Sequence, residues 1–126
     1  MPKEEIAEIE FEVQTNLLSL NRIYRVNRAG KIYKTTEAKE WEKDFFFLLP
    51  SPSGWWAKKK KRKCALGLKL LFYATNPYEF DLDNQLKLLI DVLEQKYNFN
   101  DSWIYFIEVA KVKAKETKII GRLYKL

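Results

Sequence analysis

Histidine is absent from this sequence, and cysteine occurs only once, at Cys64. A single cysteine can form no intrachain disulfide, and a chain without histidine cannot build the usual structural zinc sites. Acid/base chemistry by histidine and catalysis by a cysteine–histidine pair are excluded at the same time. Any bound metal must therefore be held by oxygen, and the side chains left for chemistry are those of Asp, Glu, Lys, Tyr and Ser.

Long apolar runs are missing as well. No stretch approaches the roughly 18 residues that a membrane span needs, and the start "MPKEEIAEIE" lacks the basic-then-apolar layout of a secretory signal. We therefore expect a cytoplasmic protein with no membrane association. A composition that is 47% hydrophobic and 15% aromatic is unlike that of disordered chains, and residues 1–126 are expected to form one domain with a buried core.

Positive charge is unevenly distributed along the chain. The net charge is +6, but the first twenty residues hold one lysine against five glutamates and contribute −4, so the rest carries +10. Such a density favours a polyanionic partner, either nucleic acid or an anionic lipid surface. A lysine-rich surface that serves only solubility is the alternative.

Local patterns predict the elements of the first half of the chain. Apolar residues alternate with glutamates over 7–13, which is the period of a strand with one face in water. Turn-forming Asn27 and Gly30 lie between two short β-prone pieces and predict an extended arm or irregular hairpin. A helix is expected to begin at Thr35 or Thr36 and to bury a stripe formed by Trp41, Phe45, Leu48 and Leu49.

The second half of the chain continues with a buried strand over 64–75 and a turn at Asn76-Pro77. A second helix is expected from Asp83, as its cap, to about Lys96. The stretches 102–115 and 117–126 read as a closing pair of strands. This order of elements predicts an α+β fold in which a small mixed β-sheet is packed with two main helices.

The second expected helix carries an unusual polar face. At 3.6 residues per turn, one narrow strip holds Asp83, Lys87 and Asp91, with Asn84 beside it. A different arc is apolar and contains Leu86, Leu89, Ile90 and Leu93. The helix is therefore amphipathic, and its polar strip holds a specific set of charged groups.

Asp81 lies two residues before that helix, close to Asp83. Two carboxylates so close repel each other unless a proton or a divalent cation lies between them. Mg²⁺ fits best, because it prefers few carboxylates together with water and substrate phosphate oxygens, and Asp81, Asp83 and Asp101 can supply such a site. In the alternative, Asp83 is only an N-cap, Asp81 is a turn residue, and Lys87 and Asp91 form a modest ion pair on a solvated face.

These residues resemble a known family. The spacing Asp81-x-Asp83-Asn84-x-x-Lys87, then Asp91-x-Leu93, Asn100-Asp101 and Lys111, is similar to the core of RusA-type Holliday junction resolvases. The arm "NLLSLNRIYRVNRAGKIYKTTEAKEW" resembles the N-terminal segment of that family. The likeness runs from Leu17 to Lys113. It departs from the family at Asn100, where an acid is usual, and in "FLLPSPSGWWAKKKKRK", which follows no family pattern.

The resemblance implies a RusA-like fold and a homodimeric endonuclease that resolves four-way (Holliday) DNA junctions by paired nicks during recombination and repair. It implies that Asp81, Asp83 and Asp101 bind a divalent metal, Mg²⁺ with Mn²⁺ as a substitute, and that Lys87 is catalytic. No small-molecule organic cofactor is expected. The alternatives are a DNA-binding protein without catalysis and a broader metal nuclease that acts on flaps or single strands.

A tryptophan pair followed by cations is a candidate for contact with DNA. Trp55 and Trp56 precede six consecutive basic residues, so this loop is suited to stack on opened bases while it neutralises phosphates. In the alternative, the loop is solvated and its tryptophans fold back on the core. The basic residues predicted to contact DNA here are Lys58, Lys59, Lys60, Lys61 and Arg62.

Other candidates for contact with DNA lie on the last strands and in the arm. Lys111, Lys113 and Lys115 alternate with small apolar residues, and three cations on one face fit a phosphate track. An edge strand whose lysines block aggregation would have the same pattern. In the arm, the residues predicted to reach DNA or a partner subunit are Asn21, Arg22, Tyr24, Arg25 and Lys34.

Overall fold

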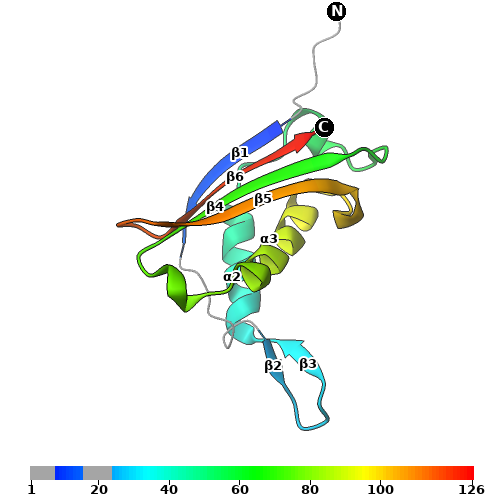
Figure 1. Cartoon of the computed structure of the whole chain (residues 1–126). Coiled ribbons are helices and arrows are strands. Elements are labelled where there is room, and N and C mark those ends of the chain that lie inside the picture. Colours follow the sequence, from blue (N-terminus) through cyan, green and yellow to red (C-terminus); the bar gives the residue numbers. More distant parts are fainter. Residues whose placement is uncertain (1–7, 16–23) are drawn as a thin grey trace, which may run out of the picture.

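The computed structural model describes residues 8–15 and 24–126. Four strands form one sheet, two helices cover one face of it, and a separate two-stranded hairpin projects from the body (Figure 1). The main elements are β1 (Glu8–Gln14), β2 (Tyr24–Val26), β3 (Ile32–Lys34), α2 (Thr36–Leu48), β4 (Leu66–Ala74), α3 (Leu82–Tyr97), β5 (Ile104–Lys113) and β6 (Lys118–Lys125). The predicted α+β class is therefore confirmed.

The sheet has the strand order β1-β6-β4-β5, so β4, whose side chains are mostly buried, lies inside the sheet between β6 and β5. β4 pairs in parallel with β5 and antiparallel with β6, and β6 pairs antiparallel with β1. Parallel neighbours need a crossover connection, which α3 supplies between β4 and β5. The two last strands of the chain, β5 and β6, are separated by β4, so the expectation that they form a closing pair is wrong, whereas the sheet is mixed, as predicted.

β1 shows the period that its sequence predicts. Ile9, Phe11 and Val13 are buried against the helices, while the intervening glutamates are exposed. The helices thus cover the face of the sheet that carries the apolar residues of β1. The strand at the opposite edge of the sheet is β5.

α2 begins where the sequence predicts. The Thr35 side chain caps it by accepting a hydrogen bond of 3.1 Å from the Ala38 N–H. Trp41, Phe45 and Leu49 are buried as expected, but Leu48 is 57% exposed and its assignment to the buried stripe is wrong. The helix ends at Leu48 and the chain turns, so Leu49 takes the buried position at its end.

The tryptophan pair belongs to the core. Trp55 is 5% exposed and Trp56 is 1% exposed, and the Trp56 ring makes edge-to-face contacts with Tyr97 and Phe99. The prediction that these rings stack on DNA bases is therefore not met here, because stacking would require the core to open. The structure follows the alternative in which the loop folds back.

Within the described residues, no helix has the length and apolar character to cross a membrane.

Gly121 of β6 lies where any side chain would collide with the core. A Cβ added there would overlap the ring of Phe11, which packs edge-on against Phe45 with ring centroids 6.2 Å apart. Gly121→Ala is expected to lower the free energy of unfolding by about 1 to 3 kcal/mol, because over-packing displaces the ring or the strand. Urea unfolding measures the loss, and adding Phe11→Leu should restore part of it. An unchanged midpoint in the single variant would contradict this packing.

Candidate active site

The segment between β4 and α3 carries the first two aspartates of the acidic motif. β4 ends at Ala74, a short turn occupies Pro77–Glu79, and α3 begins at Leu82. The N-cap position is held by Asp81, not by Asp83 as predicted, because the helix begins two residues earlier and Asp83 lies in its first turn. The Asp81 side chain makes no capping hydrogen bond, and both carboxylates are exposed.

The helix end suits these carboxylates, since the N-terminal end of a helix carries partial positive charge. The alternative in which an aspartate serves only as a cap is not supported, because neither carboxylate caps α3. Asp81 and Asp83 are thus two neighbouring, exposed carboxylates whose oxygens remain available to a ligand. Mg²⁺ is commonly bound by one or two carboxylates together with water and phosphate oxygens, so this donor pair fits a hydrated Mg²⁺ ion.

Lys87 lies one turn after Asp83 and is exposed. Among residues 8–15 and 24–126, no carboxylate lies within ion-pair distance of its ammonium. The alternative pairing with Asp91 is not formed, because Asp91 pairs with Lys34. The ammonium of Lys87 therefore faces solvent on the same end of α3 as the two aspartates.

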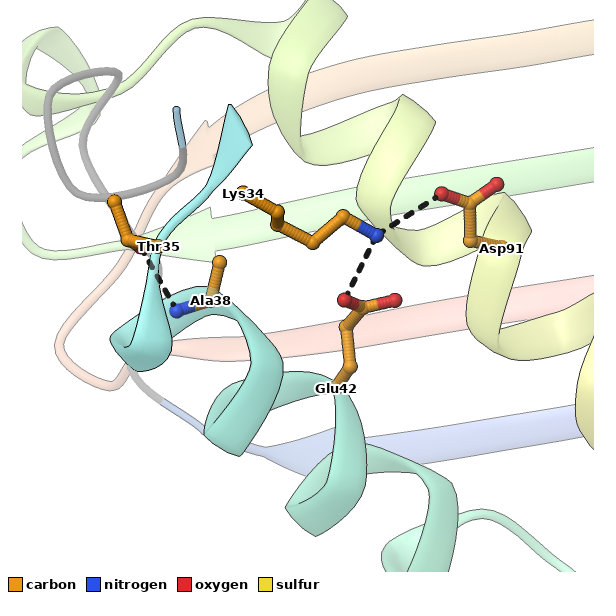
Figure 2. A network of polar contacts seen from close by, with 5 residues as sticks. All are labelled: Lys34, Thr35, Ala38, Glu42 and Asp91. Atoms are coloured by element: carbon orange, nitrogen blue, oxygen red, sulfur yellow. Dashed lines mark hydrogen bonds and ion pairs between the residues drawn. The ribbon is translucent and has the colours of Figure 1, made fainter. Parts of the chain in front are cut away.

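Lys34 links the hairpin to both helices, as Figure 2 shows. Its ammonium lies 2.9 Å from a carboxylate oxygen of Glu42 on α2 and 3.4 Å from one of Asp91 on α3. Burial alone would lower the pKa of Lys34, but the hydrogen bonds and charges of Glu42 and Asp91 outweigh burial and raise it. Lys34 was predicted to contact DNA, yet its charge is already engaged by two carboxylates, so in this structure it joins the hairpin to the helices.

Asp101 lies at the opposite end of α3 from Asp81 and Asp83. It follows the C-terminal end of that helix and precedes β5, which starts beside the first residues of β4 (Figure 1). A helix of 16 residues spans about 24 Å at 1.5 Å per residue. The three predicted metal ligands are therefore not together within one chain. Among the described residues, no three His, Cys, Asp or Glu side chains are placed to hold a metal ion.

Glu94 is a second acidic residue beside Asp101, and no sequence pattern singled it out. Glu94, on the last turns of α3, is partly buried, and its carboxylate accepts a hydrogen bond from the backbone N–H of Asp101. Burial raises the pKa of Glu94, the hydrogen bond opposes this, and the charges of Asp101 and Asp91 add to the rise. Its spacing from Asp91 is visible in the sequence, but the return of Asp101 beside it depends on the chain reversal after α3.

This environment makes a prediction for Glu94→Gln. A carboxyl whose pKa is raised by folding favours the fold below its ordinary pKa and loses that contribution as pH rises through the folded value. Glutamine keeps the acceptor oxygen and removes the repulsion. The variant should therefore be more stable than wild type at pH 7 by a few tenths of a kcal/mol, with no gain below about pH 4. Melting curves between pH 3 and pH 8 test this, and an equal gain at both extremes would contradict it.

The basic loop is tied to the C-terminal end of α3, near Asp101. The Lys61 ammonium donates to the backbone oxygen of Asn98 at 3.1 Å, and the Asn98 side chain donates to that of Lys59. A hollow of about 550 Å³ is lined there by Lys59, Lys60, Lys61, Asn98, Phe99, Asn100 and Trp103. Three of the predicted cations thus line a hollow that includes Asn100, the neighbour of Asp101, together with a partly exposed aromatic, Trp103, that no sequence pattern singled out.

The lysines of β5 do not form one exposed track. Lys111 is partly buried, and its ammonium donates to the backbone oxygens of Pro77 and Phe80 at 2.7 Å each. The prediction that it contacts DNA phosphate is not met in this structure, because those carbonyls occupy its ammonium. Lys113 is exposed, and its contact with DNA stays a prediction.

The arm is only partly within the described residues. Asn21 and Arg22 lie outside them, while Tyr24 and Arg25 belong to β2, which pairs with β3 as the predicted hairpin. The side-chain oxygen of Asn27 orders the turn by accepting from the N–H groups of Ala29 and Lys31, at 3.0 and 2.9 Å.

Comparison with known proteins gives the family. No curated protein sequence matches the chain significantly. A family model described as endodeoxyribonuclease RusA matches residues 19–121, which is most of the sequence. The match includes both aspartates at the start of α3, Lys87 and Asp101. With the acidic motif at the helix end, this match shows that the chain belongs to the RusA family of endodeoxyribonucleases.

Proposed function

We propose that the protein is a Mg²⁺-dependent endonuclease that resolves four-way (Holliday) DNA junctions by paired, symmetric nicks during recombination and repair. The observation that carries this proposal is the family match together with the two uncommitted carboxylates, Asp81 and Asp83, at the start of α3. A four-way junction has two-fold symmetry, so a homodimer with two equivalent sites can nick two opposed strands.

The position of Asp101 gives the dimer a chemical role. Because Asp101 lies at the far end of α3 from Asp81, it can join the other two carboxylates only if it comes from a second copy of the chain. In a two-fold dimer, each copy would then supply Asp81 and Asp83 to one site and Asp101 to the other. Two such sites would form together or not at all, which suits an enzyme that makes paired nicks.

The residues of this site would act as follows. Asp81 and Asp83 of one copy, with Asp101 of the other, would hold the ion, which when bound activates water and neutralises charge on phosphate oxygens. Lys87 would place its ammonium against the scissile phosphate and stabilise the charge that develops in the transition state. The basic loop would hold flanking phosphates of the same strand. The products would be a 5′-phosphate and a 3′-hydroxyl, which can be religated.

The test is cleavage of end-labelled substrates with and without Mg²⁺, with products mapped to the nucleotide. A four-way junction, a linear duplex and a flap of the same sequence serve as substrates. The expected result is paired nicks at symmetric positions of the junction, only with Mg²⁺ or Mn²⁺. Equal cutting of the flap would indicate a broader nuclease, and binding without cleavage in either metal would indicate a DNA-binding protein without catalysis.

A further inference from the structure

The side chain of Lys111, on β5, contacts the segment that leads into α3. Its side chain extends from the edge strand to the segment that precedes Asp81. There the ammonium donates to the carbonyl oxygens of Pro77 and Phe80, at 2.7 Å each, and lies 4.6 Å from the centroid of the Phe80 ring. An ammonium has three donor hydrogens, so two of them are used by the backbone of this one segment.

The segment is also fastened on its other side. Phe80 is 5% exposed and packs edge-on against Phe72 of β4, with ring centroids 6.0 Å apart. Asn76 caps the short turn by accepting from the Tyr78 N–H at 3.3 Å. Asp81 follows at once, and its carbonyl oxygen accepts from the Gln85 N–H at 3.3 Å. The backbone of Asp81 is therefore held on one side by the hydrogen bonds of Lys111 to residues 77–80 and on the other by the first turn of α3.

We propose that Lys111 is a positioning residue of the nuclease site: its ammonium fixes the 77–80 segment and thereby sets the place of the Asp81 carboxylate. This inference rests on the proposed function for its catalytic consequence. The geometry differs from that of a phosphate contact, because the ammonium is partly buried and bonded to protein carbonyls. Groups that orient a metal-binding carboxylate commonly affect metal affinity or activity by 10- to 100-fold.

The experiment compares Lys111→Met and Lys111→Arg with wild type. The matched control is Lys118→Met, which removes a lysine whose ammonium lies 5.2 Å from the Tyr73 ring centroid and 3.2 Å from a Glu12 carboxylate oxygen. Three quantities are measured: the Mg²⁺ concentration for half-maximal single-turnover cleavage of the junction, amide hydrogen exchange over residues 78–83 without metal, and the salt dependence of junction affinity in EDTA.

For Lys111→Met we expect the half-maximal Mg²⁺ concentration to rise about tenfold or more, and exchange over residues 78–83 to accelerate, with the salt dependence unchanged. Arginine keeps the charge but, as a planar fork, should not restore the wild-type Mg²⁺ requirement. Lys118→Met should keep that requirement. If Lys111→Met is unfolded at the assay temperature, Lys111→Gln replaces it with the same expectation, because its uncharged amide ends one bond short of the position of the ammonium.

Two results would overturn the inference. One is an unchanged Mg²⁺ requirement and unchanged exchange in the Lys111 variants. The other is a salt dependence reduced by about one unit in Lys111→Met with full rescue by arginine, which is the signature of a phosphate contact. Failure of the wild-type protein to cleave with Mg²⁺ would instead count against the proposed function. Hydrogen exchange would still test whether Lys111 fixes the 77–80 segment.

Discussion

Asp81→Asn is expected to abolish Mg²⁺-dependent cleavage of a four-way junction, by roughly three orders of magnitude or more (~4 kcal/mol), while junction affinity is retained or increased. An amide has the shape of a carboxylate but not its charge, so it holds a divalent ion poorly. It also no longer repels DNA phosphate, which is why binding should not weaken. Single-turnover cleavage and junction affinity in EDTA are measured on the same samples. Loss of binding in step with cleavage would remove Asp81 from the metal site.

Asp101→Asn should have the same effect by itself, and mixing the two variants separates a shared site from one within a chain. In a mixed dimer of Asp81→Asn and Asp101→Asn copies, one shared site would lack both aspartates and the other would be complete. Co-expressed, differently tagged copies purified as the mixed dimer should therefore nick one of the two strands, although each variant alone is inactive. An inactive mixed dimer would contradict the proposal that a second copy supplies Asp101.

Lys87→Ala is expected to lower the single-turnover rate by roughly two orders of magnitude or more, equivalent to ~3 kcal/mol of lost transition-state stabilisation. The reason is that its exposed ammonium shares the end of α3 with Asp81 and Asp83 and pairs with no carboxylate in the described residues. A lysine that formed only a helix-surface ion pair would cost about half a kcal/mol of stability and leave cleavage nearly unchanged. Arginine should rescue only partly, because its planar charge is placed differently.

The rate of Lys87→Ala is measured by adding Mg²⁺ to a preformed protein–junction complex, with melting temperature and affinity determined on the same samples. The matched control is Lys39→Ala, which removes an exposed lysine from α2. It should leave the rate of the bound complex unchanged. Near wild-type cleavage by Lys87→Ala would remove this lysine from the active site.

Much of the local structure could be predicted from the sequence. The alternation of apolar residues and glutamates determines a strand with one buried face, and Thr35 caps α2 as its side chain predicts. The Asp81, Asp83 and Lys87 spacing also indicated the family, while oxygen-based metal binding at these residues stays a prediction. These features follow from the sequence because they depend on residues a few positions apart, where backbone geometry alone sets which side chains are neighbours.

Only the tertiary structure decided which distant residues meet. The placement of β4 between β5 and β6 directs Lys111 to the 77–80 segment, and the length of α3 carries Asp101 away from Asp81. The burial of Trp56 depends on Tyr97 and Phe99, some forty residues later in the chain. Periodicity shows which face of an element is buried but not which element covers it, since that choice is made by packing between segments far apart in the sequence.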